Sequence, residues 1–419
     1  MTTTINNEHK ELNFSSEREQ SQACLNSAEH EKNQGRKVLN VPNLRFKEFQ
    51  GEWEKCKVSD LLDFYSTNSL SWDKLEYGTT NIQNLHYGLI HVGLPTMVDI
   101  DKDNLPNIID GNVPKNYELC KEGDIVFADA SEDTNEVAKA VEYYNLNGKK
   151  VVCGLHTIHG RDNKNKTVVG YKGYAFSSMS FHHQIRRIAQ GTKIYSINSK
   201  NFSECYVGIP SKDEQQKIAD LLRLIDERIA TQSKIIDKLQ SLIKGIAQKI
   251  VRNNKPNVRL AECLEYKSST LQESEVCEQG TYPVYGANGI VGYLDNYNTE
   301  SEAVYIIKDG SGVGTVSYVT GKCSATGTLN TLQAKEGYSL QYLYYLLKVF
   351  TFEPYKTGMA IPHIYFKDYG KVKVFCPSYT EQLQYARLLS AIEGKLSIEK
   401  NILTSLSLQK QYLLRQMFI

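Results

Sequence analysis

The sequence predicts an α+β protein with a pseudo-two-fold internal repeat: two β-rich globular domains separated by two long helices that form an antiparallel coiled coil. Three observations lead to this prediction. A segment of the chain recurs at an offset of 167 residues, each copy continues into heptad-spaced apolar residues, and short β-branched segments bounded by turn residues precede each copy.

The repeat is clearest in two segments that begin at a proline. PSKDEQQKIADLLRLIDERI begins at Pro210, and PSYTEQLQYARLLSAIEGKL begins at Pro377. The alignment holds without a gap over residues 191–239 and 358–406, and 15 of its 49 positions are identical. Chance would leave only a few identities, so the chain consists of two related halves.

Each copy of the repeat predicts the start of a helix. Ser211 with Glu214, and Ser378 with Glu381, form the S-x-x-E pattern of a capping box. In such a box the hydroxyl accepts a hydrogen bond from the amide three residues on, and the carboxylate accepts one from the amide of the cap residue. We therefore expect one long helix to begin at each box.

Apolar residues follow each box at alternating steps of four and three, which is typical of a coiled-coil seam. The predicted seam comprises Ile218, Leu222, Ile225, Ile229, Ile236 and Leu239 in the first helix and Leu389, Ile392, Leu396, Leu403 and Leu406 in the second. Polar residues interrupt it at Gln232, Glu399 and Lys410. The alternative is two amphipathic helices that each pack on their own domain. Their length and the matched phase of the seams favour pairing with each other.

These patterns divide the chain into five segments. The first 40 residues are rich in Asn, Glu, Ser and Gln and contain few apolar residues, so we expect a flexible tail. The remaining segments are a first globular domain (41–209), a central helix (210–255), a second globular domain (256–376) and a C-terminal helix (377–419).

The composition is that of a globular protein, with 41% apolar and 23% charged residues in 419. No run of residues is long and apolar enough for a membrane span, and the polar N-terminus lacks a signal-peptide core, so we expect a cytoplasmic protein. Nine cysteines without regular spacing suggest neither a disulfide framework nor a thiolate metal site. A net charge of +1 argues against DNA binding by overall charge alone, although local basic stripes remain compatible with it.

Motifs of catalysis are absent from the sequence. It contains no phosphate-binding loop, zinc-protease helix, nucleophile elbow or N-P-P-[YF] signature of amino-methyltransferases. In DGSGVGTV, the glycines at 310, 312 and 314 precede a β-branched run, which predicts a glycine-rich hairpin and not a nucleotide-binding turn. His156 and His159 have the spacing of a weak metal pair, but no partner stands at ligand spacing, so we predict no metal site. The chain is predicted to be a recognition scaffold and not an enzyme.

Two β-rich domains that are each followed by a P-S-x-x-E-Q helix closely resemble the specificity subunit of type I restriction-modification systems. The resemblance runs from about Leu44 to the C-terminus. Besides the two helices, its most specific parts are YPVYGANGIVGYLDNY in the second domain and GMAIPHIYFKDY before the last helix. It implies that each globular domain is a target recognition domain that reads one half of a split DNA sequence, and that the helices space the two domains.

The resemblance also implies partners. The expected partners are double-stranded DNA, two methyltransferase (modification) subunits and two restriction subunits, which act as translocases and endonucleases. The assembled complex would be an adenine DNA methyltransferase and an ATP-dependent endonuclease. S-adenosylmethionine, ATP and Mg²⁺ would be bound by those partners and not by this chain.

Candidate DNA-binding residues are polar or basic side chains in segments predicted to be loops, because such side chains contact base edges and phosphates. In the first domain they are Arg161, Lys164, Lys166, Arg186, Arg187, Lys193 and Tyr195. In the second domain they are Tyr285, Asn288, Lys308, Ser311, Lys356 and His363. The alternative function is a non-catalytic adaptor, whose domains bind protein or carbohydrate and whose coiled coil is a spacer. Salt-sensitive retention on DNA distinguishes the two.

Overall fold

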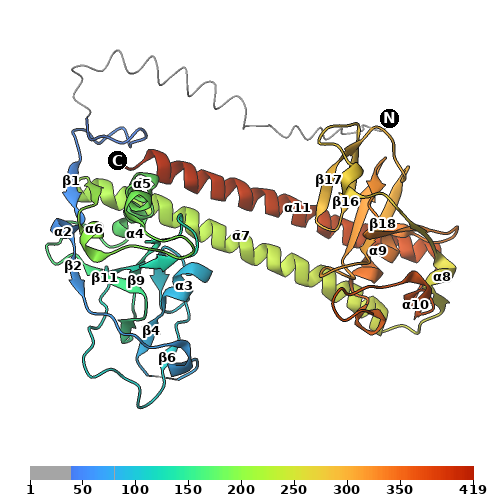
Figure 1. The fold of residues 1–419 in the computed structure, drawn as a ribbon, viewed down its shortest axis with the longest axis horizontal. Helices are drawn as coiled ribbons and strands as arrows, with labels where there is room; N and C mark the ends of the chain where they lie inside the picture. The colour runs from blue at the N-terminus through green and yellow to red at the C-terminus, as the bar shows by residue number, and fades with distance from the viewer. Residues whose placement is uncertain (1–38, 80) are drawn as a thin grey trace, which may run out of the picture. The chain divides into compact units, whose positions relative to one another are not determined.

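The computed structural model describes residues 39–79 and 81–419, which fold into two compact units (Figure 1). The first unit holds the described residues up to Arg223 together with Gln411–Ile419, and the second holds Leu224–Lys410. Because this division cuts through the two long helices, the predicted domain boundaries stay predictions. The predicted flexible tail lies outside the described residues, except for its last two positions.

Two β-sheets form the frame of the first unit. In spatial order, the larger sheet consists of β2 (Asp63–Tyr65), β11 (Thr157–Arg161), β7 (Ile125–Ala128), β9 (Ala140–Asn145) and β5 (Met97–Asp99). The smaller sheet consists of β10 (Val151–Cys153), β4 (Gln83–Leu85), β6 (Asn107–Ile108) and β3 (Leu75–Glu76). Two strand pairs are separate from these sheets: β1 (Glu54–Lys57) with β13 (Tyr206–Ile209), and β8 (Ala130–Ser131) with β12 (Tyr195–Ser196). Most neighbouring strands are antiparallel, but β5 with β9 and β10 with β4 are parallel.

Short helices cover the sheets of the first unit. They are α2 (Val58–Leu61), η1 (Trp72–Lys74), α3 (Tyr87–Val92), α4 (Tyr171–Phe176), α5 (Met179–Ile188) and α6 (Ser199–Ser203). Local signals start two of them, because the side chains of Ser178 and Asn198 accept hydrogen bonds from the amides of Phe181 and Asn201. α4 has no side-chain cap, and all six of its residues are buried, so packing in the core stabilises this helix.

The core of the first unit includes the C-terminus of the chain. The rings of Phe127, Phe176 and Phe181 pack edge to face with centroids 4.8 to 5.0 Å apart. The ring of Phe418 lies 6.0 Å from that of Tyr171, and the amide of Leu44 donates to the carbonyl of Gln416. The last residues of the chain therefore close the unit that the first described residues begin.

The second unit is built on two smaller sheets. One consists of β15 (Leu264–Ser268), β21 (Leu329–Ala334), β18 (Glu302–Ile307) and β19 (Val316–Thr320), and the other of β17 (Gly289–Leu294), β16 (Tyr282–Gly286) and β20 (Ser324–Ala325). A strand pair joins β14 (Val258–Arg259) and β22 (Lys373–Val374). The chain between β18 and β19 connects two antiparallel neighbours, which confirms the predicted glycine-rich hairpin.

The helices of the second unit are α8 (Leu260–Cys263), η2 (Glu273–Glu275), α9 (Leu340–Lys348), η3 (Glu353–Tyr355) and α10 (Phe366–Tyr369). Ser339 caps α9 by accepting from the amide of Tyr342. Seven of the nine residues of α9 are buried, so this helix is a main part of the core.

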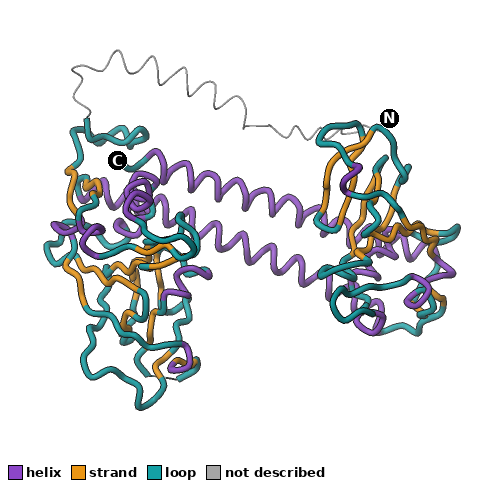
Figure 2. The backbone as a smooth tube through the Cα atoms, in the orientation of Figure 1, coloured by secondary structure: helices purple, strands orange, loops and turns teal. Residues whose placement is uncertain are grey.

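Two long helices, α7 (Lys212–Arg252) and α11 (Tyr379–Gln416), begin directly after the predicted caps and run without interruption (Figure 2). At α11 the capping box is complete, because Ser378 Oγ accepts from the amide of Glu381, and the Glu381 carboxylate accepts from the amide of Ser378. At α7 the hydroxyl of Ser211 accepts from the amide of Glu214, as predicted.

The predicted role of the Glu214 carboxylate is wrong. It binds the Arg45 guanidinium through two hydrogen bonds of 2.7 and 2.8 Å instead of reaching back to Ser211. A bidentate pair with a guanidinium is stronger than one bond to an amide, so the distant partner prevails.

Within the second unit, α7 packs against α11 with opposite chain direction. Seam residues of both helices lie in one hydrophobic cluster with the core of the unit: Ile236, Leu239, Leu389, Ile392, Leu396 and Leu403. The polar interruptions of the seam are paired, since Gln232 Nε2 donates to the carbonyl oxygen of Glu399 at 3.0 Å, and Lys410 pairs with Asp226 at 2.6 Å. In the rest of the predicted seam Ile218, Leu222, Ile225 and Leu406 are buried, while Ile229 is half-buried.

Candidate nucleic-acid interface

Each domain carries the same short turn just before its long helix. In the first domain Gln190 bridges Ser196, and 167 residues later Thr357 bridges His363. We call residues 190–196 and 357–363 the repeat turns. The second residue of each turn is a glycine with positive φ, Gly191 at +135° and Gly358 at +89°. A Cβ atom at Gly191 would lie 1.9 Å from the carbonyl oxygen of Ile194, so the turn requires glycine.

Each repeat turn lies against the segment that follows a central strand of its unit. The amide of Ile197 donates to the carbonyl of Asp129 after β7, and that of Ile364 donates to the carbonyl of Lys308 after β18, both at 3.0 Å. The two segments are FADAS and IKDGS, whose similarity is visible in the sequence. The structure therefore places equivalent loops beside equivalent turns.

The tips of both turns expose apolar side chains. Ile194 is 61% exposed and Ile361, at the equivalent position, is 57% exposed. The side chain of Met359 beside Ile361 is fully exposed. An apolar side chain that is held out at the same place in both halves has no role in the core of either domain, so it is available to a ligand.

The structure brings several candidates of the second domain together at its repeat turn. His363 Nδ1 lies 2.7 Å from Asp309 Oδ1, which fixes the turn to the glycine-rich hairpin that carries Lys308 and Ser311. Lys356, just before the turn, pairs with Glu353. The other two candidates lie on the smaller sheet. Tyr285 packs its ring on Tyr305 at 5.8 Å, and Asn288 is exposed between β16 and β17.

A polar cavity of about 590 Å³ in the second unit was missed by the sequence reasoning. Its lining includes Lys267, Ser269, Thr270, Asn296 and Asn298. Ser268 also lines it, and Lys308 Nζ lies 3.3 Å from the hydroxyl of Ser268, so the cavity opens beside the hairpin. Side chains of this kind can donate hydrogen bonds to base edges and accept hydrogen bonds from them. They come from the end of β15 with the loop after it and from the loop between β17 and β18, and no motif in the sequence groups them.

In the first domain, four candidates lie in the repeat turn or in the helix that precedes it. Arg186 and Arg187 lie in the last turn of α5, Lys193 is exposed in the repeat turn, and Tyr195 lies half-buried on β12. Arg186 donates to the side chain of Asn135 in the loop after β8. Of these basic residues, Lys193 is next to Ile194 in the chain, and a pocket that Ile194 lines also includes Glu132 and Asp133.

The remaining candidates of the first domain lie elsewhere. Lys164 donates to the carbonyl of Asp60, and Lys166 pairs with Glu54. Arg161 is buried, and its guanidinium binds Asp124 through two hydrogen bonds and Glu118 through a third. These bonds raise the pKa of Arg161 above its ordinary value. Arg161 therefore lies in the interior of the first domain, where its guanidinium is held by acidic side chains.

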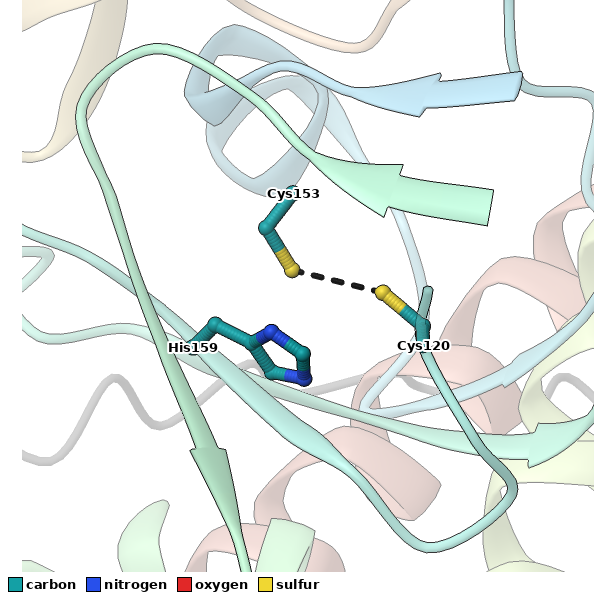
Figure 3. Close-up of side chains that lie close together, drawn as sticks. All are labelled: Cys120, Cys153 and His159. Atoms are coloured by element: carbon teal, nitrogen blue, oxygen red, sulfur yellow. Dashed lines mark hydrogen bonds between the residues drawn. The ribbon is translucent and has the colours of Figure 1, made fainter. Parts of the chain in front are cut away.

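One buried group that could hold a metal lies in the first unit (Figure 3). Cys120, Cys153 and His159 offer ligand atoms that all lie within 4.8 Å of one another. The sequence spacing paired His159 with His156, whereas the structure groups His159 with two cysteines from other segments of the chain.

A family model described as the type I restriction modification DNA specificity domain matches residues 51–241 and 253–408. A type I specificity subunit from Mycoplasma genitalium is 27% identical over 273 residues, which cover 58% of this chain and 69% of that protein. The specificity subunit of the MjaX type I restriction enzyme from Methanocaldococcus jannaschii is 23% identical over 410 residues, covering 87% of this chain and 92% of that protein.

Solved structures share the fold. The crystal structure of a type I restriction-modification S subunit from M. genitalium has a TM-score of 0.60 at 19% identity, covering 90% of this chain and 99% of that one. A chain from a type I restriction-modification system studied for complex assembly has a TM-score of 0.52 at 14% identity, covering 86% of this chain and 96% of that one. No helix among the described residues is long and apolar enough to cross a membrane.

Proposed function

Because this chain belongs to the family of type I restriction-modification DNA specificity subunits, we propose that it reads a two-part DNA sequence, one part with each domain. It is the DNA-recognition subunit of a restriction-modification system and not an enzyme. Such subunits work in complexes with DNA and with modification and restriction subunits. The two-part target and the surfaces for each partner are the new elements of the proposal.

The repeat turns support this proposal. Each domain offers a rigid glycine turn with an exposed isoleucine at its tip and basic side chains beside it. Basic side chains bind phosphates and so position a domain on the duplex, while apolar and amide side chains next to them contact base edges. The basic residues differ between the halves, Arg186, Arg187 and Lys193 in one and Lys308 and Lys356 in the other. Because the two domains carry different basic residues, we expect the two halves of the DNA target to differ in sequence.

The long helices support a two-fold arrangement of the readers. Gln232 and Glu399 occupy equivalent positions of the repeat, and they contact each other. Equivalent residues meet in this way on a two-fold axis. We propose that α7 and α11 form an antiparallel coiled coil around such an axis, so that one chain imitates a dimer on DNA.

The outer faces of the two helices are the proposed docking surfaces for the partner subunits. Apolar residues are exposed there in the second unit: Leu224, Leu242, Leu388, Ile398, Ile402 and Leu408. Exposed apolar side chains on a helix that already has a packed seam favour contact with another protein. We propose two modification and two restriction subunits as partners, with S-adenosylmethionine, ATP and Mg²⁺ bound by them.

The proposal is tested by mapping methylated adenines in cells that express the chain with its modification subunit. Replacing residues 41–209 with the matching domain of a related subunit should change one half of the methylated sequence and leave the other half intact. Point variants sharpen the test. Lys193→Ala should weaken recognition of the first half of the sequence only, and Lys308→Ala should weaken recognition of the second half only. Each variant is the control for the other. A change in both halves from either variant contradicts two separate readers.

The spacing role of the helices has its own test. Deleting one heptad from each helix, Gln232–Lys238 and Glu399–Ser405, keeps the seams in phase and shortens each helix by about 10 Å. This length corresponds to about three base pairs at 3.4 Å each. The two half-sites should survive while the gap between them contracts. An unchanged gap in an active variant contradicts the spacing role.

A further inference from the structure

We propose that Cys120, Cys153 and His159 form a zinc site inside the first domain (Figure 3). All three residues are buried, with exposed fractions of 6, 2 and 0%. The two sulfur atoms lie 3.4 Å apart, and the ligand atoms of all three residues lie within 4.8 Å of one another. Two thiolates and one imidazole are ligands that zinc prefers, and tetrahedral coordination places its ligand atoms at separations of this order.

Three segments of the fold supply the ligands. Cys120 follows the bridge between Leu119 and Val152, and its amide donates to the carbonyl of Val151 at 2.9 Å. Cys153 ends β10, and His159 lies on β11. Because β10 belongs to the smaller sheet and β11 to the larger one, an ion held by these residues ties the two sheets together.

The orientation of His159 points to a ligand. Its Nε2 lies 2.7 Å from Asp124 Oδ2, and the Arg161 guanidinium binds both oxygens of the same carboxylate at 2.8 Å. The guanidinium keeps Asp124 ionised, so this carboxylate only accepts and Nε2 must carry the proton. The lone pair therefore resides on Nδ1, which is buried and has no hydrogen-bond partner. Figure 3 shows this side of the ring turned toward the two sulfur atoms.

The hydrogen bonds from Arg161 to Asp124, and between Asp124 and His159, are of the kind that usually orient metal-binding histidines. A carboxylate on the second ring nitrogen fixes the tautomer and the orientation of the ring and makes the first nitrogen a better ligand. A buried histidine that served only to pair with Asp124 would leave its Nδ1 atom without compensation for lost hydration. Metal coordination supplies that compensation.

The charge balance of the buried group also fits zinc. Binding replaces the two thiol protons by one Zn²⁺ ion, and both protons are released to solvent. The net charge of the group is therefore the same before and after loading, with Asp124 neutralised by Arg161 in both states. Tyr143 is buried in the same hydrophobic cluster as both cysteines.

Metal analysis of the purified full-length chain tests the site. After incubation with Zn²⁺ and gel filtration in metal-free buffer, we expect about one zinc ion per chain. Cys120→Ser and Cys153→Ser should lose this ion. Cys205→Ser is the matched control, because Cys205 is buried in the same unit and lies outside the group, and it should keep the ion. Absence of zinc from the wild-type chain, or equal loss in the control, overturns the proposal.

A second measurement needs no variant and so does not depend on their folding. Loading the wild-type chain with Co²⁺ alone should give the visible bands of tetrahedral cobalt and a thiolate charge-transfer band in the near ultraviolet. Removing the metal with a chelator should speed amide exchange in residues 151–161 and leave the second unit unchanged. A spectrum of octahedral cobalt without a thiolate band overturns the proposal. So does a Cys120–Cys153 disulfide in protein purified without oxidant.

Discussion

The two helix starts have almost the same sequence but differ in their tertiary partners. Gln215 and Gln382 play the same part in both, since each side chain accepts from a backbone amide, of Val168 or Ser339, at 2.9 Å. Each also donates to the carbonyl of the proline that precedes the cap, again at 2.9 Å. The glutamine of the repeat therefore joins each helix to its own domain.

The glutamate just before that glutamine behaves differently in the two copies. Glu214 is 1% exposed and binds Arg45, whereas Glu381 is exposed and completes a local cap. The same residue at the same helix position thus serves a tertiary ion pair in one copy and a local hydrogen bond in the other. The comparison shows that a repeated motif guarantees the local geometry, while the burial of the surroundings decides what its charges bind.

The largest effect is expected when the partner of the buried glutamate is removed. Arg45→Met leaves the Glu214 carboxylate buried and unpaired, which should lower the free energy of unfolding of the first unit by about 3–5 kcal/mol. Denaturant unfolding followed by hydrogen exchange measures this loss. The matched change in the second copy, Glu381→Gln, should cost about 1 kcal/mol or less because the carboxylate is exposed. Equal losses would contradict the contrast.

Substitution of either glutamine should lower the free energy of unfolding by a smaller amount, and by a similar amount in the two units. Gln215→Leu and Gln382→Leu each remove the partner of a backbone amide and of a proline carbonyl, one of them buried, at a cost of about 1–3 kcal/mol in the unit concerned. Hydrogen exchange resolves the two units separately. Gln215 also donates to the carbonyl of Lys166, but both side chains bind a backbone amide and a proline carbonyl, so a neutral variant contradicts the prediction.

Acid should weaken the second unit through Glu393. Burial alone would raise the pKa of this carboxyl, but hydrogen bonds from Tyr345 and Lys348 hold it below its ordinary value of 4.5. A lowered folded-state pKa contributes stability above pH 4.5, and this contribution is lost as the pH falls through the folded-state pKa. Unfolding of Glu393→Gln at several pH values should show a flatter acid dependence than the wild-type chain. An identical slope would exclude this role.

The smallest effect is expected at the cap hydroxyls. Ser211 and Ser378 accept from the amides of Glu214 and Glu381 at 3.4 and 3.5 Å, which are long distances for hydrogen bonds. Ser211→Ala and Ser378→Ala should each cost about 0.5–1 kcal/mol, measured by thermal unfolding. Similar losses of stability in the two variants would support equivalent caps. A loss larger than that of the glutamine variants would contradict the prediction that the caps contribute least.

The local features of the repeat were predictable because they depend on residues that are close in the chain. The helix starts and the glycine hairpin follow from patterns within a few residues, and the structure has both. The polar interruption at Gln232 was visible in the sequence, but its bond to Glu399 depends on the register of two helices 167 residues apart.

The candidate site was predictable only in part. Lys193, Lys308 and His363 lie in or beside the repeat turns, because loops with turn residues remain on the surface. The burial of Arg161 was not predictable from its polar sequence neighbours, because it depends on distant partners in the fold. The lining of the polar cavity in the second unit comes from strands and loops that no local pattern connects.

By itself the sequence determined the internal repeat, the starts of the two long helices and the family, since all of these reside in local motifs. Only the tertiary structure decided where charges are neutralised and which distant side chains meet. Cys120, Cys153 and His159 converge because strands of two sheets bring them together, and Glu214 turns to Arg45 because burial makes an unpaired charge costly. Burial and strand pairing are long-range properties, so no spacing along the chain reveals them.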